Sequence, residues 1–529
     1  MRSSIPLVVL QGLFALSAEA QNPHHVVDPA LFPGITPSND LVWHDCYTVF
    51  KCARLTVHAK VADPRRPKKV EGNCGQPTVD LAIVKLPYFP GALHVSLGGW
   101  SSSYTNFLVR FGEDYAPLFA GYDLLAIDYR GWGWSTPAFR CFASEDERKQ
   151  FALSEPQLLG ADDAAYAARE KRADEFAKKC KKNGEDVGRF MGTYSNAVDH
   201  YTVMRAENRT KMGFWGISSG AHLGRTIAQL YPEVVEKFLF DSPAPSSLAY
   251  TVTTAQPSQI KNAERGLEAF FYTYLKAPAG NCSFAGPSTT TVELRGRYNA
   301  LETKLKTGAL TVNGTSKRFD WSALHSFLTI SLHGPGCIPV LGGVLSEIGY
   351  VTTSVLNQPP APLPLLTEDA PFEGILAGVC TDERQHVKGN RDDFKSYFKS
   401  MTEAAPSVAA IFSEWRLVCS KWKTDPVNVL DGQGSAFRGP VKTQGKFVVV
   451  NGVGDPASSV EGAKGVAAQF SPSVLVKTLA AGHTSFTAIN DCLFGVFCTF
   501  FVLGQMPAGG ATCGNLSAPP FGAQLPSGF

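Results

Sequence analysis

Three side chains with the chemistry of an acyl-transfer site follow apolar segments of this 529-residue chain. Ser218 lies in the pentapeptide Gly-Ile-Ser-Ser-Gly, Asp455 follows the apolar segment 446–452, and His483 follows the apolar segment 474–479. A serine hydroxyl is a poor nucleophile at neutral pH and needs a base within hydrogen-bond reach. A histidine supplies that base when a carboxylate fixes its tautomer. The order serine, acid, histidine therefore predicts hydrolysis through an acyl-enzyme on Ser218.

The segment around Ser218 predicts a strand that turns sharply into a helix. Its apolar run 214–217 stops at the serine, and a helical pattern follows. Gly216 and Gly220 allow the strained turn that exposes the hydroxyl. Because the chain has 49 glycines, this pentapeptide pattern should arise by chance roughly a few tenths of a time. The assignment therefore depends on the acid and the histidine also standing at strand ends.

Each of the three groups has a definite predicted role. The histidine would accept the serine proton and later give it to the leaving group. Asp455 would orient the imidazole and stabilise the imidazolium. The negative charge that develops on the carbonyl oxygen needs two backbone donors. We expect one to be the N–H of Ser219, and the other to come from Gly99 or Trp100, in the glycine turn after an earlier apolar strand.

Three other polar residues compete for these roles. His222 lies one helical turn after Ser218, where we expect a packing or surface role. Asp491 follows His483 too closely to orient it and should lie on the closing helix. Asp128 also ends a predicted strand, but the Arg-Gly-x-Gly that follows it indicates that it anchors a loop.

The three residues need a sheet that brings strand ends together. Apolar runs at 92–97, 123–128 and 235–241 are nearly continuous, which is typical of parallel strands covered on both faces. The carboxyl ends of such strands meet at one edge, where α/β sheets place their sites. The segment 244–442 instead alternates helical patterns with loops rich in proline and glycine. We therefore predict an α/β fold with a mostly parallel central sheet, helices on both faces and an inserted helical cap.

The expected organisation has four parts. Residues 1–20 read as a secretory signal peptide, with an apolar segment and a small-x-small cleavage motif. Residues 21–243 and 443–529 form the two parts of the core, and residues 244–442 form the cap. No other segment reaches the roughly 18 apolar residues of a membrane span, so we expect a secreted protein without a membrane partner.

Composition excludes several other classes of function. The net charge of +2 gives no footprint for nucleic acid, and the absence of heptads gives no indication of an oligomeric state. The 12 cysteines include no C-x-x-C pair and fit a disulfide framework in an oxidising compartment. We expect no metal and no cofactor, because no cluster has metal-ligand spacing and no phosphate loop is present. Four sequons are compatible with glycosylation: Asn208, Asn281, Asn313 and Asn515.

Motifs along most of the mature chain resemble one family, the secreted tripeptidyl and prolyl aminopeptidase group of α/β hydrolases. The matching motifs are Gly216-Ile217-Ser218-Ser219-Gly220 with Leu223-Gly224, Asp128-x-Arg130-Gly131-x-Gly133-x-Ser135-Thr136-Pro137, Asn451-Gly452-x-x-Asp455-Pro456, Ala481-Gly482-His483 with Cys492, Thr512-Cys513, Trp43-x-x-Cys46, and Cys380-Thr381-Asp382 with Trp415-x-x-x-Cys419. The resemblance implies the α/β-hydrolase fold with a helical cap. It also implies four disulfides, Cys46–Cys52, Cys141–Cys180, Cys380–Cys419 and Cys492–Cys513, and leaves Cys74, Cys282, Cys337 and Cys498 unassigned.

The sequence departs from this family around the predicted nucleophile. Trp100 follows Gly99 where relatives have a longer run of Gly and Pro, and Ser219 stands where tyrosine is common. The family's aminopeptidases also need an acidic group to hold the substrate ammonium. Glu264, Glu268, Glu347 and Glu373 are equal candidates for that group.

These features lead to one expected function and two alternatives. The expectation is a serine hydrolase that releases short N-terminal fragments from peptides, with the peptide preference implied by the resemblance alone. The first alternative is a carboxylic-ester hydrolase or lipase, because the same three residues serve esters. The second is a catalytically silent binding protein on the same fold.

Overall fold

The computed structural model describes most of the chain. The described residues are 30–61, 76–99, 103–245, 256–276, 284, 288–308, 310–311, 318–334, 372–383, 387, 390–428, 440–485 and 490–514. The expected signal peptide 1–20, Trp100 and Glu347 lie outside this part, as do the unassigned Cys74, Cys282 and Cys337.

A ten-stranded sheet runs through the described part of the chain, in the order β1-β2-β3-β5-β4-β6-β7-β10-β11-β12. Pairing is antiparallel from β1 to β5 and parallel from β5 to β12. The strands are β1 His44–Cys46, β2 Phe50–His58, β3 Thr78–Leu86, β4 Gly91–Ser96, β5 Tyr122–Ile127, β6 Met212–Ile217, β7 Val235–Asp241, β10 Val441–Gly454, β11 Phe470–Ala481 and β12 Thr512–Cys513. This is the mostly parallel α/β-hydrolase sheet that the apolar runs predicted.

Burial explains why these segments form central strands. Every residue of β5 and of β6 is buried, as a strand covered on both faces requires. The described helices outside the segment between β7 and β10 are α2 Leu31–Gly34, α3 Tyr104–Tyr115, η1 Ala116–Phe119, α4 Glu145–Leu153, α5 Ala165–Gly188, α6 Thr193–Ala206, α7 Ser219–Leu230, η2 Pro232–Val234, α16 Val460–Ala467 and α17 Asp491–Phe501. Among them, α7 packs on β6 and β7, while α16 packs on β10 and β11.

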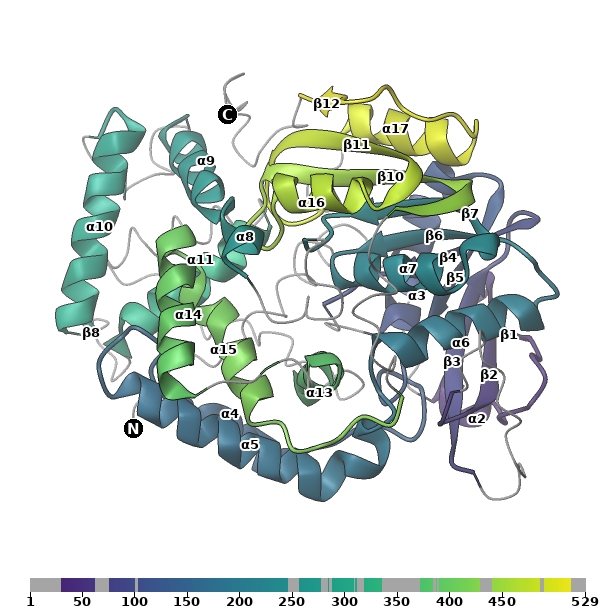
Figure 1. Ribbon diagram of the computed structural model, residues 1–529, viewed down its shortest axis with the longest axis horizontal. Coiled ribbons are helices and arrows are strands. Elements are labelled where there is room, and N and C mark those ends of the chain that lie inside the picture. Colours follow the sequence, from purple (N-terminus) through teal and green to yellow (C-terminus); the bar gives the residue numbers. More distant parts are fainter. Residues whose placement is uncertain are drawn as a thin grey trace.

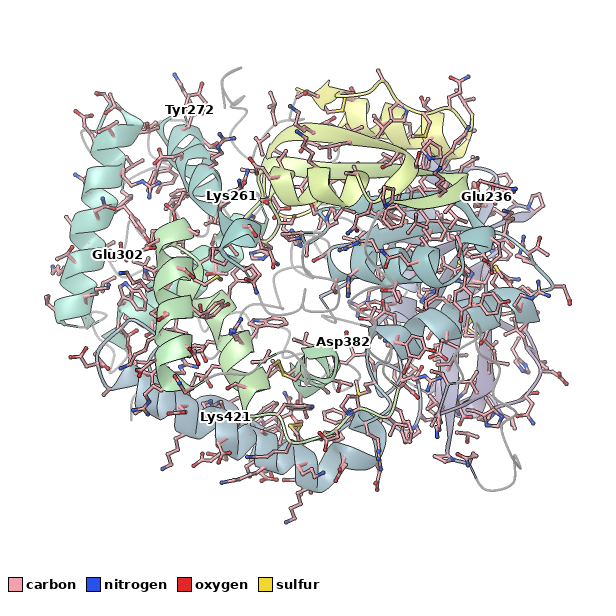
Figure 2. All side chains as sticks on the ribbon, in the orientation of Figure 1. Glu236, Lys261, Tyr272, Glu302, Asp382 and Lys421 are labelled. Carbon is pink, nitrogen blue, oxygen red and sulfur yellow. A yellow bond between two sulfur atoms is a disulfide. The ribbon has the colours of Figure 1, made fainter. Side chains whose placement is uncertain are left out.

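The described chain between β7 and β10 is mostly helical and lies beside the sheet, away from strands β1 and β2 (Figure 1). Its elements are α8 Pro257–Ile260, α9 Ala263–Lys276, α10 Thr291–Thr307, the short pair β8 Leu310–Thr311 and β9 Arg318–Phe319, α11 Trp321–His333, α13 Phe372–Glu383, α14 Arg391–Ala404 and α15 Ala409–Ser420. Helices α9, α11 and α15 share an apolar core that includes Phe270, Leu324 and Ile411, whereas Leu376 and Val379 of α13 belong to the core of the sheet. Glu302 of α10, labelled in Figure 2, accepts a hydrogen bond from the indole N–H of Trp321 at 3.0 Å.

Helix α5 lies with these helices, although it precedes β6 in the chain. We call this group of helices the helical half of the molecule. It runs beneath α14 and α15 in Figure 1, and Arg169 of α5 pairs with Glu414 of α15 at 3.2 Å. Lys421, at the end of α15, pairs with Glu170 of α5 at 2.8 Å (Figure 2). The helical half is therefore built from two separate stretches of chain.

Helix α13 is absent from the sequence-based expectation. Its described side chains are almost all buried, so the alternation of polar and apolar faces that identifies a surface helix is missing. The helix ends against α6, where Asp382 accepts hydrogen bonds from the Thr193 N–H at 2.9 Å and from the Thr193 hydroxyl at 2.6 Å (Figure 2). A carboxylate at the first turn of a helix is favoured by the helix dipole.

The four disulfides implied by the family resemblance are confirmed: Cys46–Cys52, Cys141–Cys180, Cys380–Cys419 and Cys492–Cys513. Cys498 is a free cysteine. None of the helices in the described ranges is long and apolar enough to cross a membrane.

Candidate active site

Ser218 occupies a strained turn between β6 and α7. Its backbone has φ 56° and ψ −119°, a conformation that costs a non-glycine residue energy and is retained where the surroundings impose it. The two flanking glycines are sterically required. A Cβ at Gly216 would overlap the carbonyl oxygen of Gly220, and a Cβ at Gly220 would overlap that of Ser96. This local geometry agrees with the strand-turn-helix expectation.

Ser218, His483 and Asp455 form one continuous hydrogen-bonded line. The Nε2 of His483 lies 2.8 Å from the Ser218 hydroxyl, and its Nδ1 lies 2.9 Å from both carboxylate oxygens of Asp455. Asp455 and His483 are buried, while Ser218 is half-buried. The sequence singled out these three side chains. The structure brings them together, although Ser218 and His483 are 265 residues apart in the chain.

The electrostatics of Asp455 favour an ionised carboxylate beside the imidazole. Burial raises its pKa, but the charge and hydrogen bonds of His483, with further bonds, bring the pKa below its ordinary value. The N–H groups of Ala457 and Ser458 donate to it at 2.8 and 2.9 Å, and the Ser458 hydroxyl donates at 2.9 Å. These donors satisfy a charge that would otherwise be costly to bury.

Asp241, the last residue of β7, and Ser242, which follows it, hold the loop that carries His483. Asp241 accepts hydrogen bonds from the Ser485 N–H at 2.9 Å and from the Ser485 hydroxyl. The Ser242 hydroxyl accepts one from the Thr484 N–H at 3.1 Å. Burial raises the pKa of the Asp241 carboxyl to about 6. Sequence reasoning missed this support, although the polar pair directly after an apolar strand was a visible signal.

The helical half also reaches the histidine. The N–H of His483 donates to the carbonyl oxygen of His333, the last residue of α11, at 2.8 Å. The two imidazole rings meet edge to face with their centroids 5.5 Å apart. No pattern in the sequence indicated this contact, because it joins segments whose relation is set only by packing.

Two of the three predicted oxyanion donors, Gly99 and Ser219, meet where the turn after β4 reaches the start of α7. A Cβ at Gly98 would lie 2.6 Å from the backbone nitrogen of Ser219, so only glycine allows this turn to approach so closely. The Gly99 N–H donates to the Ser219 hydroxyl at 2.6 Å. Trp100, the other predicted donor, lies outside the described residues.

The chain matches known hydrolases at the segments that carry these residues. Residues 93–331 match the family model described as alpha/beta hydrolase fold, and residues 405–513 match the model described as TAP-like protein. The first span contains Ser218, and the second contains Asp455 and His483. The two matches together support a TAP-like α/β-hydrolase family for this chain.

The curated relatives that this chain matches are distant. It is 26% identical to the tripeptidyl aminopeptidase of Streptomyces lividans over 155 residues, which are 29% of this chain and 28% of the relative. It is 24% identical to the putative hydrolase YuaR of Escherichia coli strain K12 over 193 residues, 36% of this chain and 35% of that protein. Each alignment spans well under two thirds of the relative. The solved structure of Cfl2 wild-type from Burkholderia cenocepacia has a TM-score of 0.34 at 12% identity and covers 87% of this chain and 99% of its own.

The three rival residues lie in different surroundings. His222 is buried in α7, and burial, with the charge of Arg225, lowers its pKa to about 3. Asp128 accepts hydrogen bonds from the N–H groups of Tyr104 and Trp134 at 2.6 and 3.0 Å, so it anchors a loop as the sequence indicated. Asp491 is exposed in the first turn of α17.

The described candidates for an ammonium anchor also differ from one another. Glu264 and Glu268 both pair with Arg295, at 3.1 and 2.5 Å. Glu373 is buried at the start of α13, where burial raises the pKa of its carboxyl. Across the described ranges, no group of three or more His, Cys, Asp or Glu side chains is arranged to hold a metal ion.

Proposed function

We propose that the chain is a serine hydrolase that forms an acyl-enzyme on Ser218. The observation that carries this proposal is the unbroken line of hydrogen bonds from Asp455 through His483 to the Ser218 hydroxyl. A nucleophile in contact with a base, and a base in contact with an orienting carboxylate, is the arrangement that serine hydrolysis requires. The matches to the alpha/beta hydrolase fold and TAP-like family models support the same function.

The reaction follows from the roles of the three groups. The Ser218 oxygen attacks the carbonyl carbon of the substrate while His483 takes the hydroxyl proton. The tetrahedral oxyanion receives hydrogen bonds from the N–H groups of Ser219 and Gly99. Its collapse breaks the bond to the leaving group, which takes the proton from the imidazole. Water, deprotonated by His483, then attacks the acyl-enzyme, releases the carboxylic acid and restores the serine.

We propose peptides with a free N-terminus as substrates, from which the enzyme releases short fragments. The support is the relative named tripeptidyl aminopeptidase, and the transfer to this chain rests on that likeness. The panel that tests the proposal contains a tripeptidyl amide with a free amino group, its N-blocked counterpart and a p-nitrophenyl ester. Fluorophosphonate labelling of the wild type and of Ser218→Ala identifies the nucleophile.

The panel separates three outcomes. Cleavage of the free amide, with much slower cleavage of the blocked one, supports the aminopeptidase. Ester turnover without amide cleavage contradicts it and identifies an ester hydrolase. No turnover of any substrate, together with no labelling at Ser218, would identify a binding protein on this fold.

We also propose that residues 244–442 act as a cap on a core formed by 21–243 and 443–529, and that the protein is secreted after loss of 1–20. Contact of α11 with the histidine loop supports the first part, and the four disulfides support an oxidising compartment. N-terminal sequencing of the exported protein should start at Gln21. An intact Met1 on exported protein would contradict the signal peptide.

A further inference from the structure

One contact in the site is not used by the reaction described above. The backbone N–H of Gly99 donates to the hydroxyl of Ser219 at 2.6 Å. Both residues are half-buried beside Ser218, and the Gly98 backbone packs against the start of α7. The Gly99 N–H, one of two donors that the developing oxyanion needs, is therefore already engaged by a side chain.

The position of the Ser219 hydroxyl matches that of an oxyanion. A donor nitrogen stabilises an oxyanion that lies about 2.7–3.1 Å away. The hydroxyl lies 2.6 Å from the Gly99 nitrogen, just below the short end of this range. It therefore occupies the position of an acceptor for the Gly99 N–H, and a substrate oxygen cannot take that position while the hydroxyl remains there.

We propose that the Ser219 hydroxyl closes the oxyanion hole of the resting enzyme, and that the substrate oxygen displaces it during acylation. This inference rests on the proposed serine-hydrolase function. The displacement requires only rotation of one short side chain about χ1, and an oxyanion replaces a neutral hydroxyl as the acceptor. Hydrogen bonds to a charged acceptor are stronger than those to a neutral one, so formation of the transition state favours the exchange. Ser219 is in this sense a positioning residue, since it acts through the Gly99 N–H.

The variants Ser219→Ala and Ser219→Thr test the proposal. Alanine removes the competing acceptor and keeps the backbone N–H groups, so kcat/KM should rise about threefold to tenfold, the value of one net hydrogen bond. Threonine keeps a hydroxyl at the same position and should return kcat/KM to near the wild-type value. Fluorophosphonate labelling counts the active sites, so that rates refer to folded enzyme. An increase in rate is not expected from loosened packing.

A second readout does not depend on activity. Hydrogen–deuterium exchange of the Gly99 amide should be about threefold to tenfold faster in Ser219→Ala than in the wild type, because the amide loses its acceptor. Ser219→Thr should exchange at the wild-type rate. The same comparison is made in the Ser218→Ala background, where no acyl-enzyme forms.

The two readouts together decide the proposal. Faster exchange with higher kcat/KM supports a closed hole. A kcat/KM that falls in Ser219→Ala overturns it and identifies the hydroxyl as a third donor to the oxyanion, and unchanged values of both readouts also overturn it. If no substrate is turned over, the proposed function fails separately. The exchange rate then still decides the contact: acceleration supports the engaged Gly99 amide, and an unchanged rate overturns it.

Discussion

At the scale of single residues, the site depends on hydrogen bonds that satisfy the buried Asp455 carboxylate beside His483. Three donors from the Ala457–Ser458 turn hold the Asp455 carboxylate, and one imidazole nitrogen faces it at 2.9 Å. The other nitrogen is thereby left to face the Ser218 hydroxyl. Which nitrogen carries the proton follows from this arrangement, because a carboxylate accepts hydrogen bonds and does not donate them.

The first prediction at this scale concerns the base. His483→Ala should lower kcat by about 10⁴-fold or more, since removal of a member of such a triad leaves only binding and oxyanion stabilisation. The measurement is turnover of the substrate that the panel identifies, with circular dichroism to verify the fold. The comparison variant is His222→Ala, in helix α7, which follows Ser218. If that variant lost activity while His483→Ala stayed near the wild type, the proposed triad would be wrong.

At the scale of elements, the segment that contains helices α8 and α9 holds the loop that carries Asp455. The Gln259 amide donates to the carbonyl oxygen of Ala457 at 2.9 Å, and the Asn262 amide donates to that of Val453 at 2.7 Å. These bonds lie on either side of Asp455. The salt bridge between Lys261 and Glu461, at 3.0 Å, joins the same helices to α16 (Figure 2). The helical half is thus attached directly to the strand end that positions the carboxylate.

The second prediction concerns a close approach between helix α9 and the end of strand β10. A Cβ added at Gly266 of α9 would lie 2.7 Å from the Gly454 carbonyl oxygen, so Gly266→Ala must push α9 away from the end of β10. We expect a loss of about 1–3 kcal/mol in the free energy of unfolding. Displacement of the acid should also lower kcat/KM by about tenfold to a hundredfold.

The matched control is Gly296→Ala in α10, where an added Cβ would meet nothing within 4 Å. Alanine should stabilise that helix by about 0.5–1 kcal/mol, and activity should not change. Urea unfolding and steady-state kinetics of both variants make the comparison. Equal kinetics in the two variants would mean that the packing of α9 on β10 does not position Asp455.

At the scale of the whole molecule, several buried titratable groups have pKa values that are shifted from their ordinary values. Burial, with the charge of Arg209, lowers the pKa of His94 to about 3, and burial lowers the pKa of His200 well below its ordinary value. Their Nδ1 atoms lie 2.9 Å apart between β4 and α6. In the opposite direction, burial raises the pKa values of Asp128 and Asp382 to about 6. The stability of the fold should therefore depend on pH.

The third prediction follows from the histidine pair. The unfolded chain protonates these side chains near pH 6.5, while the folded protein keeps them neutral. The unfolded state therefore binds more protons, and the histidines' contribution to stability is present above pH 6.5 and is lost as the pH falls below it. Each should cost about 1 kcal/mol between pH 6.5 and 5.5. The buried carboxyls act in the opposite sense as the pH falls through about 6, because the folded state holds their protons more tightly.

The double variant His94→Leu, His200→Leu isolates the pair from the carboxyls. The free energy of unfolding in urea, measured at pH 7.5 and 5.5, should change less with pH in this variant than in the wild type, by about 3 kcal/mol. His44→Gln, at the exposed β1, is the surface control. An identical pH dependence in the wild type and the double variant would contradict the assignment.

The sequence alone determined the α/β-hydrolase fold and the three residues of the proposed triad. Apolar runs without alternation require strands covered on both faces, and parallel strands place their carboxyl ends at one edge. These are local patterns, so Ser218, Asp455 and His483 could each be found from the residues that precede them. The four disulfides were accessible only through a family resemblance, because connectivity does not follow from spacing.

Only the tertiary structure decided how the helical half meets this site. The described side chains of helix α13 are almost all buried, so they give no periodic pattern of polar and apolar residues. The bond from His483 to His333 joins elements separated by a long stretch of chain. The hydrogen bond from the Gly99 N–H to the Ser219 hydroxyl forms only where the turn after β4 meets the start of α7. Such contacts are set by packing between distant segments, and periodicity and turn chemistry, which are local, carry no information about them.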